Sequence, residues 1–226
     1  MKHSKILKNS FVLVACTGLS ACFGSTGGTG GGPGGGVSFA SYQGEFDRVT
    51  NQAPTSDMPT SLQASYSGAM RADVTDGSAV VGQILADVNL DVDWTDGSSA
   101  NPFSGGASNF QGTMDGGTTV GDIEGTLSVD SALPNAILRN TTTVPLPTGG
   151  TQTLNTGALS VSLAGTLTAD GESVDTNLFL GGNFFGPGAT AAVGTVVGGF
   201  SPEGTDPLQG IFTGGSVGGT FYLEAD

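Results

Sequence analysis

The sequence has 226 residues, of which 40 are glycine and only 12% are charged, and its net charge is −14. This length suits a single domain of ordinary size, and the acidic charge argues against binding to nucleic acid or to anionic lipid head groups. Both cysteines and the single histidine lie within the first 22 residues, so the rest of the chain has no thiol or imidazole.

Residues 1–22 have the pattern of a bacterial lipoprotein signal peptide. Three lysines precede a short apolar run at residues 11–18, and Leu19-Ser20-Ala21-Cys22 follows it as a lipobox. We expect cleavage before Cys22 and attachment of fatty acids, palmitate among them, to that cysteine. Cys16 follows a similar pattern but would leave only about five apolar residues before it, fewer than an export signal needs. The apolar run is also too short to remain as a membrane span.

Residues 23–36 contain mainly Gly, Ser and Thr and can bury almost no apolar surface. We expect them to be a flexible tether with a reach on the order of 20 Å. The remaining segment, 37–226, is then one domain held beyond a membrane surface.

Loss of the signal peptide would change the chemistry of the chain. It removes all three lysines and leaves Arg48, Arg71 and Arg139 against 20 acidic residues, a net charge of −17. Without His, Lys or a free thiol, three common ways of activating a nucleophile are absent. We therefore expect neither an enzyme nor a metal site, and no cofactor.

Alternating apolar and polar residues, the pattern of half-buried β-strands, recur from residue 62 onward. Asp-Gly pairs at 76–77, 96–97, 115–116 and 170–171 separate these runs and are strong hairpin signals. We predict an all-β fold, a single up-and-down antiparallel β-barrel of about eight strands. Trp94 is expected inside it, and the only helical turn is expected near residues 134–138. The acidic row from Asp87 to Asp93 is interpreted as the solvated face of a strand and not as a cation site, because its spacing does not fit a calcium loop.

The segment 182–200 is predicted to be one hairpin of this barrel. Two alternating runs flank Gly186-Pro187-Gly188, where proline ends the ladder and glycine allows the reversal.

The hairpin also resembles a known signature. The residues that carry the resemblance are Gly182, Phe184, Phe185, Gly186, Pro187, Ala189, Gly198, Gly199 and Phe200. Together they resemble the barrel signature of the surface lipoproteins related to transferrin-binding protein B and factor H-binding protein. The resemblance implies a barrel on the outer face of the outer membrane that captures host proteins or carriers of iron or haem.

The longest connection between predicted strands is 131–153, and we take it as the candidate binding loop, since long loops in compact domains are often functional. Its apolar and basic residues are Leu133, Ile137, Leu138, Arg139, Val144 and Leu146. The same apolar residues are also suited to closing one end of the barrel.

The sequence thus predicts a lipid-anchored outer-membrane protein at the cell surface, a monomer with a protein or iron/haem-carrier ligand. Two alternatives stay open at this point. One is a structural envelope lipoprotein without a specific ligand, and the other is an eight-stranded outer-membrane barrel.

Overall fold

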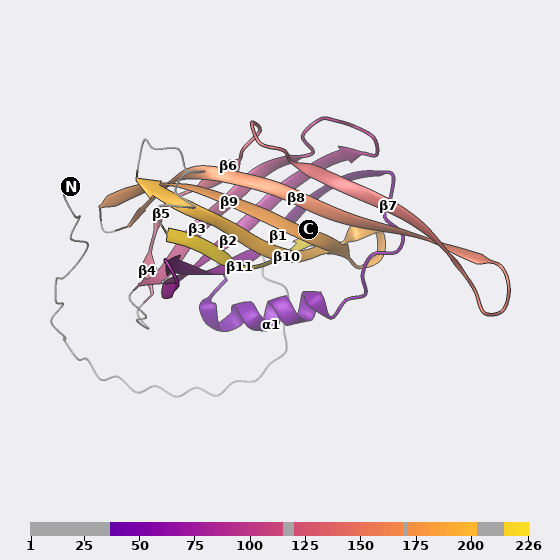
Figure 1. Ribbon diagram of the computed structural model, residues 1–226, viewed down its shortest axis with the longest axis horizontal. Helices are drawn as coiled ribbons and strands as arrows, with labels where there is room; N and C mark the ends of the chain where they lie inside the picture. Colours follow the sequence, from indigo (N-terminus) through magenta and orange to yellow (C-terminus); the bar gives the residue numbers. More distant parts are fainter. Residues whose placement is uncertain (1–36, 115–119, 170, 203–214) are drawn as a thin grey trace. The chain divides into compact units, whose positions relative to one another are not determined.

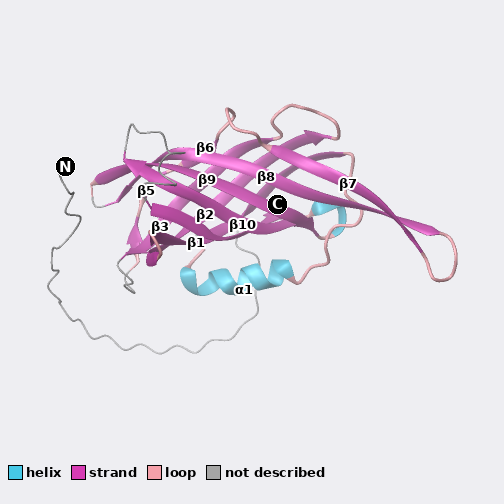
Figure 2. Ribbon diagram, viewed as in Figure 1, coloured by secondary structure: helices cyan, strands magenta, loops and turns pink. Residues whose placement is uncertain are grey.

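The computed structural model describes residues 37–114, 120–169, 171–202 and 215–226. These residues belong to one compact unit. The described chain is mostly β-strand, with one α-helix (Figure 2). Its elements are α1 (Phe39–Thr50), β1 (Ser61–Asp76), β2 (Ala79–Thr95), β3 (Phe103–Met114), β4 (Gly121–Asp122), β5 (Glu124–Gly125), β6 (Leu127–Val129), β7 (Ala136–Pro145), β8 (Thr151–Ala169), β9 (Glu172–Phe185), the 3-10 helix η1 (Pro187–Ala189), β10 (Ala191–Pro202) and β11 (Gly215–Ala225).

The strands form one antiparallel sheet that closes on itself. Strands β1 to β3 and strands β8 to β11 pair in their sequence order, and β1 closes the ring by pairing with both β2 and β11 (Figure 1). The short strands β4 to β7 follow one another between β3 and β8, so they fill one place in a ring of eight positions. The predicted all-β, antiparallel meander of about eight strands is confirmed.

Tight turns hold neighbouring strands in register. Gly77 and Gly171 have φ of 60° and 79°, the conformation that makes Asp-Gly a hairpin signal. A third predicted turn lies at Asp96-Gly97, after β2. The fourth, at 115–116, falls outside the described residues.

The inside of the ring is a continuous apolar core. Along β2, Val88, Leu90, Val92 and Trp94 are buried, while the residues between them face solvent. Trp94 is 4% exposed and belongs to the main cluster, so its predicted interior position is confirmed. Side chains therefore fill the ring.

Glycines make room for one of the largest interior rings. Gly182 and Gly194 lie opposite each other on β9 and β10, and a Cβ at either position would lie 2.9 Å and 2.7 Å from the Phe221 ring. The Phe221 ring therefore packs directly against two backbones, as the glycine-rich hairpin suggested.

Helix α1 was not predicted from the sequence and is a correction to it. It begins at a capping box formed by Ser38 and Ser41, and it packs on the outer face of the ring. Tyr42 and Val49 are its fully buried residues, and they contact a second apolar cluster that includes Tyr222. The predicted helical turn near 134–138 is wrong, because β7 begins at Ala136.

Two arginines hold α1 against the strands. Arg48 forms an ion pair with Glu45 at 2.8 Å and a forked pair with Glu224 of β11. Hydrogen bonding from Arg48 lowers the pKa of Glu224. The Arg71 guanidinium lies 5.0 Å from the centre of the Tyr42 ring. The Tyr42 hydroxyl donates to the backbone oxygen of Thr220 at 2.7 Å. Tyr42 is therefore held by a cation–π contact with β1 and by a hydrogen bond to β11.

Buried tyrosines are expected to make the fold sensitive to alkali. Burial raises the pKa of Tyr66 to about 12, and its hydroxyl donates to the Ala189 carbonyl. Tyrosine in the unfolded chain ionises near pH 10, so this contribution to stability is complete below about pH 10 and is lost as pH rises towards 12. We expect Tyr66→Phe to weaken the fall in the free energy of unfolding above pH 10, as measured by urea titrations between pH 8 and 11.5. Curves of equal slope for the variant and the parent chain would contradict this.

Candidate functional site

The residues of the predicted binding loop form a β-ribbon at one end of the ring. β7 pairs with β8 from Ala136 opposite Ser160 to Pro145 opposite Thr151. The neighbouring strand β9 pairs with β8 only from Ala158 onward, so the first part of β8 and the end of β7 project beyond the ring (Figure 1). We call this segment, residues 139–157, the projecting ribbon.

The tip of the projecting ribbon is a short turn. The Gly149 N–H donates to the Leu146 carbonyl at 3.0 Å, and the Leu146 N–H donates to the Gly150 carbonyl at 3.1 Å. Gly149 and Gly150 both have positive φ, which glycine adopts without strain. The predicted connection of more than 20 residues is therefore replaced by a strand pair with a tight turn.

The chain before β1 braces the base of the projecting ribbon. The Asn155 N–H donates to the Ser56 carbonyl at 2.8 Å, and the Met58 N–H donates to the Asn155 carbonyl at 2.9 Å. Arg139 donates from Nε to the Met58 carbonyl at 3.0 Å and lies 3.5 Å from Asp96. Arg139 was predicted as a residue of the candidate binding loop, and its guanidinium holds the segments around the base together.

These hydrogen bonds show which way the main chain of β7 faces. Both main-chain groups of Asn155 point away from β7, and Thr141 lies opposite Asn155. Facing residues of an antiparallel pair exchange either both hydrogen bonds or none, in alternation. The N–H and C=O groups of Thr141 and Thr143, and the C=O of Pro145, therefore point to the outer edge of β7. Proline, which has no N–H, suits such an edge position.

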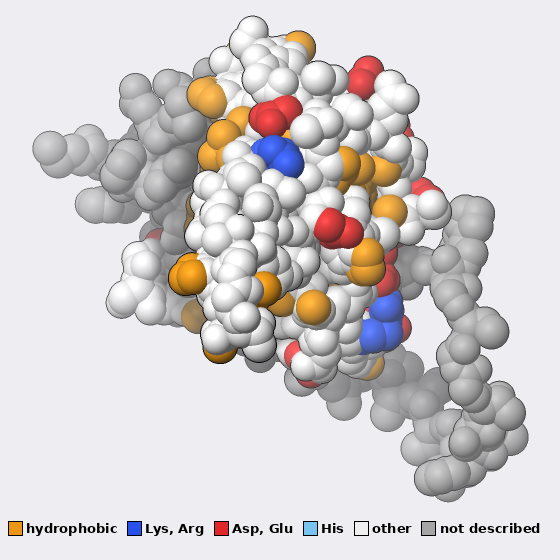
Figure 3. Space-filling model, turned by 90° about the vertical axis from the view of Figure 1, so that its right-hand side faces the viewer, with side chains coloured by type: hydrophobic (Ala, Val, Ile, Leu, Met, Phe, Trp, Pro, Cys, Tyr) orange, Lys and Arg blue, Asp and Glu red, His pale blue; other side chains and the backbone are white. Residues whose placement is uncertain are grey.

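Beyond Arg139 at its base, the projecting ribbon is uncharged in an otherwise acidic protein. No Asp, Glu, Lys or Arg occurs from Asn140 to Ala169. Figure 3 looks at this end of the molecule, where most of the described surface is uncharged and hydrophobic side chains are scattered among polar ones. Around the base, Arg139 and Asp96 supply charge.

The six predicted contact residues have different environments. Leu138 and Leu146 are 67% and 39% exposed, as a contact surface requires. Leu133 and Val144 are half-buried, and Ile137 belongs to the core. The structure therefore brings only the two exposed leucines to the surface as free apolar side chains.

The residues of the resembled signature have structural positions. Phe184 is buried and lies 6.2 Å from Tyr66, measured between ring centres. Gly186 has φ 73° and Ala189 has φ 68°, so both shape the turn between β9 and β10. Gly198, Gly199 and Phe200 lie on β10, and Phe185 packs partly against the cluster beneath α1.

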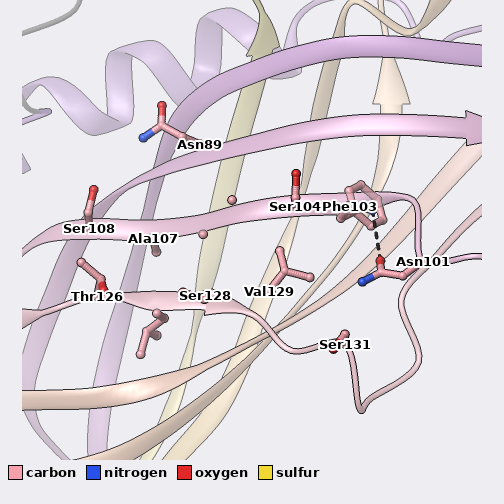
Figure 4. Close-up of a pocket in the computed structure, with 13 residues that line it drawn as sticks. Asn89, Asn101, Phe103, Ser104, Ala107, Ser108, Thr126, Ser128, Val129 and Ser131 are labelled. Atoms are coloured by element: carbon pink, nitrogen blue, oxygen red, sulfur yellow. Dashed lines mark hydrogen bonds between the residues drawn. The ribbon is translucent and has the colours of Figure 1, made fainter.

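A shallow groove of about 670 Å³ lies where β6 separates from β3. The two strands pair only at Gly106 with Ser128 and at Ala107 with Leu127. Beyond this point, apolar side chains such as Phe103 and Val129 and small polar ones such as Ser104 line the opening together (Figure 4). The groove arises from the short length of β6, which no sequence pattern indicates. Its lining carries no charge, and we assign it no ligand.

The described residues contain no group of three or more His, Cys, Asp or Glu side chains that could hold a metal ion. In the acidic row on β2, Asp91 accepts a hydrogen bond from Ser65 at 2.6 Å and Asp93 accepts one from Gln63 at 3.2 Å. Both acids are exposed, as the solvated-face interpretation predicts. Among the described residues, no helix is long and apolar enough to cross a lipid bilayer.

Comparison with known proteins does not place the chain in a family: no family model, no curated protein and no solved structure matches it.

Proposed function

We propose that this chain is an outer-membrane lipoprotein that presents a ring-shaped β domain at the cell surface to bind a partner protein. The observation that carries the proposal is the lipobox ending at Cys22, followed directly by the glycine-rich segment 23–36 and then by the domain. A lipid anchor and a flexible spacer are what a displayed domain needs.

The projecting ribbon supports a binding role. In a closed ring the main-chain groups of each strand are hydrogen-bonded to the neighbouring strands. A partner is therefore expected to bind the segments at the ends of the ring. Leu138 and Leu146 expose apolar surface there, within a polar and uncharged surround. Apolar side chains within a polar rim are typical of protein contact surfaces. The resemblance to host-protein and iron- or haem-carrier binders suggests the kind of partner.

The outer face of the ring favours contact with water over contact with lipid. On β1 and β2 this face carries Gln63, Ser65, Asp91 and Asp93, which are exposed. Charged side chains on a lipid-facing strand are costly near the middle of a bilayer. This observation supports an anchored domain over an eight-stranded outer-membrane barrel, the alternative that the strand pattern also allows.

The anchor is tested by replacing the acylated cysteine. We expect Cys22→Ala to abolish fatty-acid labelling and to leave an uncleaved precursor, because the thiol that would carry the lipid is gone. Cys16→Ala is the matched control and should be labelled and processed normally. Undiminished labelling of Cys22→Ala would exclude this anchor, and loss of labelling in Cys16→Ala instead would move it.

A further inference from the structure

The outer edge of β7 has free main-chain groups. The N–H and C=O groups of Thr141 and Thr143 and the C=O of Pro145 point along this edge, away from β8. Within the described parts of the chain, no backbone partner is found for them. Such a row of groups is a template for another strand.

The usual protections of a strand edge are nearly absent. Exposed edges are commonly blunted by lysines, by inward-pointing charges or by bulges. The projecting ribbon has no charged residue beyond Arg139, and β7 and β8 pair without a break in register. Pro145 interrupts the edge only at its end, and the Thr141–Val144 run consists of β-branched residues, which favour strands.

The net charge restricts which parts of two copies can meet. At −17 after processing, two copies repel each other through their acidic walls. Beyond Arg139 the projecting ribbon is uncharged and extends away from those walls. Charges farther apart than about 8 Å are largely screened at physiological salt. Contact through the ribbons is therefore the approach with the least repulsion.

We propose that β7 pairs edge to edge, antiparallel, with β7 of a second copy of this chain. With Thr143 opposite its counterpart, each Thr143 N–H meets the other Thr143 carbonyl, and each Thr141 N–H meets a Pro145 carbonyl. The Thr141 C=O of each copy faces Pro145 of the other copy, which has no N–H to donate. The edge is therefore self-complementary except for this one hydrogen bond on each side. This pairing goes beyond the proposed function and replaces the monomer expected from the sequence. It uses the main-chain edge, whereas a partner protein is proposed to meet the side chains of Leu138 and Leu146.

The test uses the full chain in its membrane, with Thr143→Cys and a short bismaleimide cross-linker. We expect a covalent dimer of twice the chain mass, because the two substituted residues face each other. Ser98→Cys, in the exposed turn after β2, is the matched control and should give only background. The unsubstituted chain is run in parallel. A cross-link in that chain would come from a free thiol at Cys16 or Cys22, so it would report a failed anchor and not the pairing of β7.

A second substitution separates edge pairing from mere proximity. Adding Thr141→Pro removes an outward N–H without touching the β7–β8 ladder and should abolish the cross-link, whereas adding Thr141→Val should preserve it. Circular dichroism of both variants checks that they remain folded. A Thr143→Cys dimer no stronger than that of Ser98→Cys would overturn the proposal. So would a dimer that persists in folded Thr141→Pro chains, or a cross-linked product whose mass indicates a different protein.

Discussion

Replacing Trp94 with Ala is expected to lower the free energy of unfolding by about 3–5 kcal/mol. The Trp94 side chain is 4% exposed and lies opposite Leu62 on β1, inside the main core cluster. Removing the ring leaves a cavity that strands fixed in a closed sheet cannot collapse to fill. Urea denaturation of the variant and of the parent chain measures the difference.

The control for Trp94 is Asn89→Ala, on the outer face of the same strand. Asn89 is exposed, so this change should alter the free energy of unfolding by less than about 0.5 kcal/mol. A loss of under about 1 kcal/mol for Trp94→Ala would place the indole outside the ring and contradict the described orientation of β2.

Shortening the projecting ribbon is expected to abolish partner binding while the ring stays folded. The sharpest variant replaces residues 143–153 with Asn-Gly between Thr142 and Leu154. These two residues face each other as a hydrogen-bonded pair, the geometry that a two-residue turn closes. The variant removes Leu146 and keeps the brace from Arg139 and Asn155.

Two measurements on the shortened variant decide the outcome. Partner binding is measured by cross-linked capture from cell envelopes, and stability is measured by thermal melting. Ser98→Gly with Ala100→Gly, in the turn after β2, is the control and should keep the partner. A partner captured equally by the shortened variant would favour a structural lipoprotein without a ligand at this end. A sharp fall in melting temperature would show that the ribbon serves mainly to stabilise the ring.

The strands could be predicted because most of the ring has one apolar face and one polar face. The alternation from Val88 to Trp94 and the turns at Gly77 and Gly171 are local signals, and tertiary packing preserves them. The glycines at 182 and 194 likewise indicated close packing, although the ring that uses the space, Phe221, is distant in sequence.

Helix α1 was missed because its apolar residues are few and its polar face is large. Phe39, Tyr42, Phe46 and Val49 do recur at helical spacing, and Ser38 is a suitable N-cap. That spacing over a single stretch of 12 residues is a weak helix signal. Its stability depends on long-range contacts, such as those of Tyr42 with β11, which no local pattern reveals.

The candidate binding segment was predicted to be a loop, whereas most of it is a strand pair. The segment contains prolines at 134, 145 and 147, yet the β-branched run from Thr141 to Val144 forms a strand. Arg139 was interpreted as a contact residue because so few basic residues remain. Its contacts with Met58 and Asp96 join segments that are far apart in sequence, and sequence spacing alone could not have shown this.

The central claim, an anchored domain that meets water and not lipid, is tested most directly by folding residues 37–226 in buffer without detergent. A β-type circular dichroism spectrum and a single cooperative urea transition are the predicted result, because the core lies inside the ring and exposed acids such as Asp91 lie outside. A chain that aggregates in buffer and gains that spectrum only in detergent micelles would contradict the account and favour an outer-membrane barrel.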